Sequence, residues 1–118
     1  MSSQKITDLT YLESISMDDD GLVAEMINLF LENSPLMLKN LSAFYEQGDF
    51  KKLSAEAHKY KPTLSYMGME NAKEILVEIE DSAKSKTNTD QIPEKIRFLE
   101  EQCSQAKSEL TEVLKQIK

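Results

Sequence analysis

The last quarter of the chain carries the most regular apolar pattern in the sequence. From residue 96 onward, apolar side chains recur at alternating intervals of three and four, at Ile96, Leu99, Cys103, Ala106, Leu110, Val113 and Ile117. This seven-residue period places them along one face of an α-helix, whereas a strand would need alternation at every second residue. Pro93 suits the first turn of such a helix. The pattern therefore predicts a long C-terminal helix that packs lengthwise against other helices.

Three further segments have helical spacing, and no strand-like alternation persists. The segment from about 19 to 47 keeps one helical phase across Pro35, which predicts a single helix kinked at that proline. Its apolar residues are Leu22, Met26, Leu29, Phe30, Met37, Leu41 and Phe44. The segment from 49 to 67, capped by Asp49, has Phe50, Leu53, Ala57, Tyr60, Leu64 and Met67. The segment from about 70 to 84 has Ala72, Ile75, Leu76, Ile79 and Ala83. The short connections at Gly48 and Gly68 make consecutive helices antiparallel neighbours.

The N-terminal region predicts a short additional helix. Residues 1–5 are polar and expected to be disordered. Residues 8–15 can form a helix capped by Asp8, with Leu9, Leu12 and Ile15 on one side. The polar residues 85–91 are expected to be the most mobile internal loop. The whole pattern predicts one all-α domain over residues 1–118, an antiparallel four-helix up-down-up-down bundle with a short N-terminal helix.

Composition excludes several classes of protein. A chain of 118 residues supports one core, and a net charge of -7 argues against a nucleic-acid partner. No apolar run is long enough to span a bilayer, and the polar start lacks the apolar core of a signal peptide, so a cytoplasmic protein is expected. Cys103 is the only cysteine, which leaves neither an internal disulfide nor a thiol cluster for a metal. The C-terminal stripe could form a coiled-coil dimer, but matching faces in the same chain favour a monomer.

The only histidine, His58, lies outside the apolar stripe of the 49–67 helix. At about 100° of rotation per residue it falls roughly 130° from the centre of that stripe, so its imidazole is expected to face solvent. The neighbours expected one turn away are all small or short and would leave the ring accessible to a second macromolecule. They are Ser54, Ala55, Pro62 and Ser65.

Lysines surround His58 in the sequence. Residues 51–61 contain four lysines and one glutamate, although the chain as a whole is acidic. Lys61 follows His58 by three residues, and Lys51 shares its face two turns earlier. An exposed neutral imidazole beside ammonium groups suits nucleophilic attack on a phosphoryl group, because the lysines balance the charge of the arriving oxygens. Spacing alone leaves open the alternative that His58 is an ordinary solvated surface residue.

The order of residues after His58 resembles the signature of histidine-containing phosphotransfer (Hpt) domains. That signature reads His-x-hydrophobic-Lys-Gly, a few small residues, then a hydrophobic residue and Gly. His58, Tyr60, Lys61, Met67 and Gly68 match it. Pro62 departs from it, because the family has glycine there; proline is also compact, but it removes the amide that would bond the carbonyl of His58. The resemblance extends as a helical pattern over roughly residues 8–117.

The resemblance implies a phosphorelay intermediate rather than a self-sufficient enzyme. His58 would accept a phosphoryl group from the aspartyl phosphate of one receiver domain and pass it to another, with Lys61 stabilising the phosphate. The expected partners are response-regulator receiver domains and a hybrid sensor kinase, and the receiver would hold the Mg²⁺. No metal or cofactor is expected on this chain, which has no glycine-rich nucleotide loop.

The short N-terminal helix is the expected docking surface for a receiver. Tyr11, Ile15 and Met17 are apolar residues that the bundle does not need for its core. The alternative function is a helical protein–protein adaptor in which His58 is incidental and carries no phosphate. A metal or haem bundle would need several inward-facing ligands, which a single outward histidine does not supply.

Overall fold

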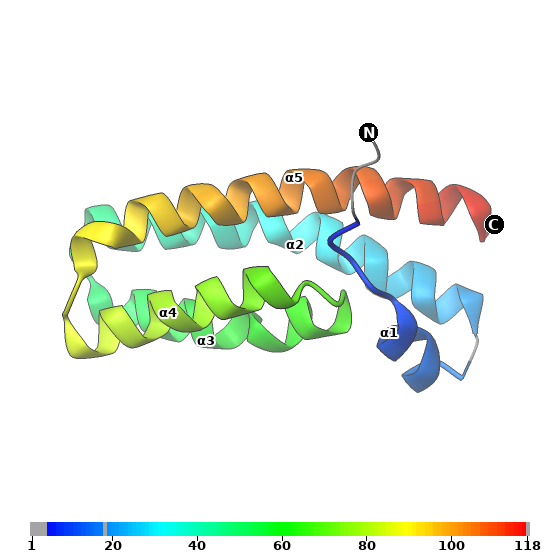
Figure 1. The fold of residues 1–118 in the computed structure, drawn as a ribbon, viewed down its shortest axis with the longest axis horizontal. Helices are drawn as coiled ribbons and strands as arrows, with labels where there is room; N and C mark the ends of the chain where they lie inside the picture. Colours follow the sequence, from blue (N-terminus) through cyan, green and yellow to red (C-terminus); the bar gives the residue numbers. More distant parts are fainter. Residues whose placement is uncertain (1–4, 18, 118) are drawn as a thin grey trace.

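The computed structural model describes residues 5–17 and 19–117, which form only helices and connecting turns. Their order is α1 (Thr10–Ile15), α2 (Asp20–Glu46), α3 (Phe50–Tyr66), α4 (Glu70–Ser85), a 3₁₀ turn η1 (Thr89–Gln91) and α5 (Ile92–Gln116). Figure 1 shows α2 and α5 as one long antiparallel pair and α3 and α4 as a shorter hairpin packed against it. The predicted all-α, up-down-up-down bundle with a short N-terminal helix is confirmed. Of residues 1–5, which were predicted to be disordered, 1–4 lie outside the described residues, and Lys5 belongs to no helix.

The unequal helix lengths explain the position of α1. Helices α2 and α5 have 27 and 25 residues, whereas α3 and α4 have 17 and 16. The long pair therefore extends about 15 Å beyond the hairpin at 1.5 Å per residue. Helix α1 lies at this end, beside the first half of α2 and the turn between α3 and α4 (Figure 1). Leu12 is fully buried there, so α1 covers apolar surface that the hairpin leaves open.

The core confirms most of the predicted stripes. In α5, the residues of the seven-residue pattern from Ile96 to Leu110 are buried. Val113 and Ile117 are partly buried and pack against the edge of the core. In α3, the predicted stripe is buried except for Phe50, which is half-buried. Helix α2 continues through Pro35 as one helix, as predicted. Asp49 accepts a hydrogen bond from the backbone N–H of Lys52 at 3.1 Å, so its role as a cap is also confirmed.

The predicted face of α2 was partly wrong. Leu22 and Leu29 are 40% and 46% exposed, and with Leu36 they form a solvent-facing row at intervals of seven. The buried face comprises Val23, Ile27, Phe30, Ser34, Met37 and Leu41. The misassigned residues lie in the first half of the helix, where apolar residues occur in adjacent pairs. Leu22 is followed by Val23 and Leu29 by Phe30, and in each pair the second residue is the buried one. Apolar character alone does not show which member of such a pair faces the core.

Two local predictions near the chain turns also need correction. Asp8 does not cap α1: its carboxylate accepts from the N–H of Thr10 at 3.0 Å, while Leu9 occupies the cap position. The carboxylate thus forms a turn just before the helix. The segment 85–91 is not a simple loop, because α4 includes Ser85 and residues 89–91 form η1.

The segment preceding α1, residues 5–9, is here called the N-terminal strap. The carboxylate of Glu109 on α5 accepts hydrogen bonds from the N–H groups of Ile6 and Thr7 at 3.0 Å each, and from the Thr7 hydroxyl at 2.6 Å. The N–H of Asp8 donates to the Met67 carbonyl at 3.0 Å. The strap is thus joined both to α5 and to the turn between α3 and α4, and it fixes where α1 begins.

Gly68 should be far less tolerant of alanine than Gly48. Both have positive φ, +68° and +71°, but a Cβ on Gly68 would lie 2.2 Å from the Asp8 carbonyl oxygen, whereas one on Gly48 would meet nothing within 4 Å. Both substitutions introduce left-handed strain of about 1 kcal/mol. Only Gly68→Ala also displaces the strap, which adds about 1–3 kcal/mol as overpacking does. Urea unfolding of the two variants measures the difference; equal losses of stability would contradict the close strap contact.

Candidate functional site

His58 lies on the outer face of α3, and 68% of its side chain is exposed. The predicted apolar stripe of α3, which includes Ala57 and Tyr60, is buried on the other side of the helix. The expected outward orientation of the imidazole is therefore confirmed. Lysines were predicted beside the ring, but no carboxylate was, and here the structure adds the main feature of the site.

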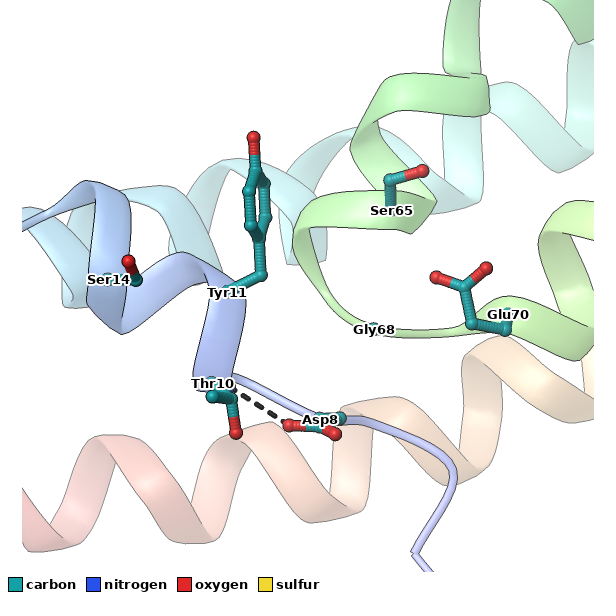
Figure 2. Close-up of a pocket in the computed structure, with 7 residues that line it drawn as sticks. All are labelled: Asp8, Thr10, Tyr11, Ser14, Ser65, Gly68 and Glu70. Atoms are coloured by element: carbon teal, nitrogen blue, oxygen red, sulfur yellow. Dashed lines mark hydrogen bonds between the residues drawn. The ribbon is translucent and has the colours of Figure 1, made fainter.

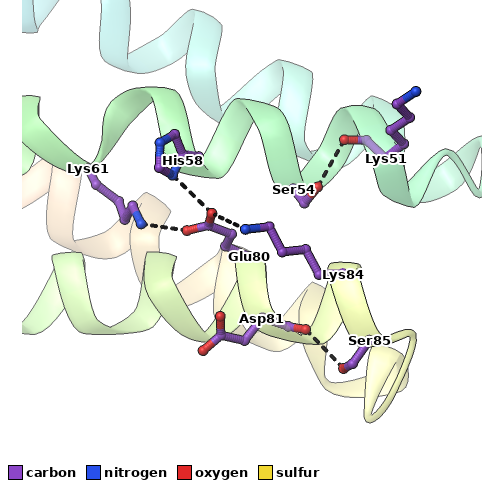
Figure 3. Close-up of polar contacts among 8 residues, drawn as sticks. All are labelled: Lys51, Ser54, His58, Lys61, Glu80, Asp81, Lys84 and Ser85. Carbon is purple, nitrogen blue, oxygen red and sulfur yellow. Dashed lines mark hydrogen bonds and ion pairs between the residues drawn. The ribbon is translucent and has the colours of Figure 1, made fainter.

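A buried carboxylate on α4, that of Glu80, contacts the imidazole. Nδ1 of His58 lies 3.0 Å from Glu80 Oε2, across the interface between α3 and α4 (Figure 3). Two ammonium groups contact the same carboxylate: Lys61 Nζ is 2.7 Å from Oε1, and Lys84 Nζ is 3.1 Å from Oε2. Glu80 is only 3% exposed. Three side chains from two helices thus converge on one buried carboxylate, and we call His58, Lys61, Lys84 and Glu80 the Glu80 cluster.

The charge state of Glu80 follows from its surroundings. Burial raises the pKa of this carboxyl, but the hydrogen bonds from Lys61 and Lys84, the charge of Lys61 and the contact with His58 outweigh burial and hold the pKa at about 2. Glu80 is therefore ionised at neutral pH and can only accept hydrogen bonds. For the 3.0 Å contact to be a hydrogen bond, Nδ1 of His58 must carry the proton. The neutral ring then has its unprotonated nitrogen, Nε2, on the side away from Glu80.

A hollow of about 310 Å³ adjoins the imidazole. Its lining residues come from α3 and α4, and they are His58, Lys61, Pro62, Ser65, Lys73 and Val77. Pro62 and Ser65 thus border the open space beside the ring, as expected for short neighbours, and Ala55 is exposed. Space for a small group exists next to His58, on the side of the ring that faces the end of α3.

Three residues predicted to surround His58 lie elsewhere. Ser54 is not an outward neighbour: it is 8% exposed, and its hydroxyl donates to the Lys51 carbonyl at 3.0 Å. Lys51 is exposed, but its side chain lies apart from the Glu80 cluster (Figure 3). Gly68 does not line the His58 hollow. The assumption that residues near in helical rotation stay open to solvent was wrong for Ser54, because α4 packs over that flank of α3.

Gly68 belongs to a second, larger hollow of about 650 Å³ between α1 and the turn that joins α3 to α4. Figure 2 shows its lining, which is Asp8, Thr10, Tyr11, Ser14, Ser65, Gly68 and Glu70. Ser65 borders both hollows, so the surface beside α1 is continuous with the surface beside His58. The Tyr11 ring stacks on Tyr66 with centroids 6.0 Å apart.

Apolar side chains are exposed on and after α1, the helix that borders this second hollow. Tyr11, Ile15 and Met17 are 54%, 45% and 87% exposed, in line with the expectation that the bundle does not need them for its core. Leu22 of α2 is exposed as well. We call these four residues the α1 apolar surface. Such a concentration of exposed apolar groups at one end of a small domain is typical of a protein-binding site.

Sequence reasoning missed Glu80, Lys84 and Lys73. One signal was available for Glu80: it follows Leu76 by four residues and so falls within the buried stripe of α4. A carboxylate in a buried stripe needs cationic partners, which directs attention to lysines on the facing helix. Lys84 then follows Glu80 by four residues, the spacing of a helical ion pair.

The described part of the chain has neither a metal-binding cluster nor a membrane-spanning helix. Among residues 5–17 and 19–117, no three His, Cys, Asp or Glu side chains gather as a metal site would require. No helix in these ranges combines the length and apolar character needed to cross a membrane.

Comparisons with known proteins agree with the helical arrangement. The family model described as the Hpt domain matches residues 25–117. The structure is similar to the crystal structure of the HPT domain from an Hpt sensor hybrid histidine kinase of Shewanella, with a TM-score of 0.77 and 20% sequence identity over 94% of this chain and 95% of that one. The comparison with curated proteins gave no match. Because the family model covers most of the sequence, including His58 and the rest of the Glu80 cluster, the chain belongs to the Hpt domain family.

Proposed function

We propose that this chain is a phosphorelay intermediate in which His58 Nε2 accepts a phosphoryl group from an aspartyl phosphate and later passes it to another aspartate. The observation that supports this most directly is the exposed imidazole held at Nδ1 by an ionised, buried Glu80. That contact keeps the ring in one orientation and leaves Nε2 as the nucleophilic atom.

The proposed step is a displacement at phosphorus. The lone pair of Nε2 forms an N–P bond while the P–O bond to the donor aspartate breaks, and its electron pair returns to that carboxylate oxygen. No proton leaves Nε2, because the ring proton is on Nδ1. The phosphorylated ring is therefore cationic, and the Glu80 carboxylate at 3.0 Å stabilises that charge. Transfer onward reverses the step, with the acceptor carboxylate attacking phosphorus and the electron pair returning to Nε2.

Lys61 and Lys84 have two effects in this proposal. Their ammonium groups keep Glu80 ionised, which in turn keeps the proton on Nδ1. Lys61 also lines the hollow beside His58 and can balance charge on the phosphoryl oxygens, although its own charge is largely offset by Glu80 at 2.7 Å. The role of Lys61 is thus mainly to support the carboxylate, with phosphate stabilisation as a secondary effect.

The proposed partners are receiver domains of response regulators and of a hybrid sensor kinase. A receiver would contribute the aspartate and the Mg²⁺, and this chain would contribute the nucleophile and a docking surface. The α1 apolar surface supports such docking, because it is continuous through Ser65 with the hollow beside His58. A protein seated on α1 could then extend toward the imidazole without crossing buried elements.

Incubation with a panel of phosphorylated receiver domains tests the proposed function. The chain should acquire phosphate that is labile in acid and stable in base, as a phosphoramidate is, and a second receiver should remove it. Loss of label to the second receiver distinguishes a relay intermediate from a terminal acceptor. Receiver binding without any labelling would contradict phosphotransfer and would favour the adaptor alternative.

Met17→Asp should weaken receiver binding while the bundle stays folded. Met17 is 87% exposed and has φ of +53°, a conformation that aspartate tolerates better than methionine does. The substitution therefore places a charge on the α1 apolar surface without a cost to the fold. We expect at least about tenfold weaker binding, as for loss of a central interface residue. Ile15→Asp should act in the same direction.

Titration of a labelled receiver against these variants provides the measurement. Thr111→Asp is a matched control, because Thr111 is exposed on α5 and gains the same charge. Wild-type affinity for both Met17→Asp and Ile15→Asp would mean that receivers dock on another face of the bundle.

A further inference from the structure

The hollow beside His58 contains a second lysine whose environment differs from that of Lys61. Lys73 lies on α4, seven residues before Glu80, so both face α3 with Val77 between them. Lys61 and Lys84 are both engaged with the Glu80 carboxylate. Within residues 5–17 and 19–117, Lys73 makes no ion pair with a carboxylate. The hollow is therefore lined by one lysine whose charge is offset and one whose charge is not.

This difference matters for binding an anion next to Nε2. A phosphoryl group carries three acceptor oxygens and needs donors around it. If Lys61 moved fully to the phosphate, Glu80 would lose its closest ammonium while remaining buried, which is unfavourable. Lys73 can donate without breaking any ion pair. It is also half-buried, so part of its conformational freedom is already lost before a phosphoryl group arrives.

We infer that Lys73 is a phosphoryl-binding residue of this site, contacting the oxygens of the group carried by His58; this inference rests on the proposed function. The three lysines of the site then have different roles. Lys61 and Lys84 hold the carboxylate that orients the ring, and Lys73, from α4, supplies a positive charge that no carboxylate of residues 5–17 and 19–117 pairs with. Ser65 also lines the hollow, and its hydroxyl can act as a further donor.

Phosphorylated wild-type chain and three variants test the inference. Lys73→Ala removes the ammonium, Lys73→Arg keeps a cation, and Lys107→Ala removes an exposed lysine of α5 that does not line the hollow. Transfer from a phosphorylated receiver to Lys73→Ala should be roughly three- to tenfold slower than to the wild type, the range for one partly exposed charge-assisted contact. Lys73→Arg should recover most of the rate, and Lys107→Ala should match the wild type.

A second measurement separates contact with the phosphoryl group from a role in docking or folding. A nearby ammonium favours the dianionic phosphoryl group and so lowers its pKa; the midpoint of the ³¹P chemical-shift titration should therefore move to higher pH in Lys73→Ala and return in Lys73→Arg. Slower transfer with an unchanged midpoint would overturn the inference and assign Lys73 to receiver docking. An unchanged rate and midpoint would also overturn it. If the wild type itself takes up no phosphate, the proposed function fails, and Lys73 is not the cause.

Discussion

His58→Gln is expected to abolish phosphoryl transfer to the chain while the bundle remains folded. His58 is the only histidine, so no other imidazole can take its place. Its side chain is 68% exposed and contributes little packing, and Glu80 keeps both lysine partners after the substitution. The change in the free energy of unfolding should stay within about 0.5 kcal/mol, as for other surface substitutions.

Radiolabel from a phosphorylated receiver and thermal unfolding by circular dichroism provide the two measurements. Lys59→Gln is the matched control, because Lys59 is the exposed neighbour of His58 and lies outside the Glu80 cluster. Undiminished labelling of His58→Gln would move the phosphoryl acceptor to another residue. An unfolded variant would show instead that His58 is structural.

Glu80→Ala is expected to reduce both transfer and stability. The substitution removes the hydrogen-bond acceptor of His58 Nδ1, so the ring no longer has a fixed orientation or tautomer, and transfer should slow by more than about tenfold. It also leaves Lys61 and Lys84 without their carboxylate. Because both ammonium groups can reach water, the loss of stability should be about 1–3 kcal/mol, below that for a fully buried pair.

Glu80→Gln distinguishes the role of Glu80 in orienting the His58 ring from the role of its negative charge. The amide oxygen can still accept from Nδ1, but it no longer balances the two lysines or a cationic phosphorylated ring. Transfer should therefore be slower than in the wild type and faster than in Glu80→Ala. Equal transfer rates in all three proteins would show that the Nδ1 contact does not contribute to the reaction.

The difference in stability between the wild type and Glu80→Gln should depend on pH. The pKa of Glu80 is about 2 in the folded chain, below its ordinary value of 4.5, so its ionisation stabilises the fold at pH values above 4.5. That contribution is lost as the pH falls from 4.5 toward 2. The stability difference between wild type and Glu80→Gln should shrink over this range, and denaturant unfolding at several pH values measures it. The pKa of Glu109 is also lowered, but Glu109 is common to both proteins, so the subtraction removes its effect.

The fold was predictable because the apolar spacing that encodes it is local. The C-terminal stripe and the stripe around Ala57 each specify a helix face without reference to the rest of the chain. The error in α2 arose where apolar residues are adjacent, as in Leu22–Val23 and Leu29–Phe30. Which member of such a pair is buried can be recognised only when the packing of α2 against its neighbours is known.

The candidate site was predictable only in part, because its chemistry joins two helices. The exposure of His58 followed from rotation along α3 alone. The contact with Glu80 links residues 22 apart in sequence and depends on how α3 and α4 align. Lys61 was predicted as a phosphate partner from its distance along the chain, whereas the alignment of the helices places its ammonium 2.7 Å from Glu80. Gly68 matches the family signature, yet its local environment is set by Asp8.

The N-terminal strap has a consequence for the order in which the parts of this protein can fold. Its hydrogen bonds to Glu109 join residues 102 or 103 positions apart, so they close almost the whole chain into a loop. Contacts of such long range form late, because the loop-closure entropy must be overcome before they contribute. A polypeptide still emerging from the ribosome can build the α3–α4 hairpin and pair His58 with Glu80 before α5 exists. The strap gains its hydrogen bonds to Glu109 only after α5 has folded, so the nucleophile can be assembled before the surface proposed to receive its partners is fully anchored.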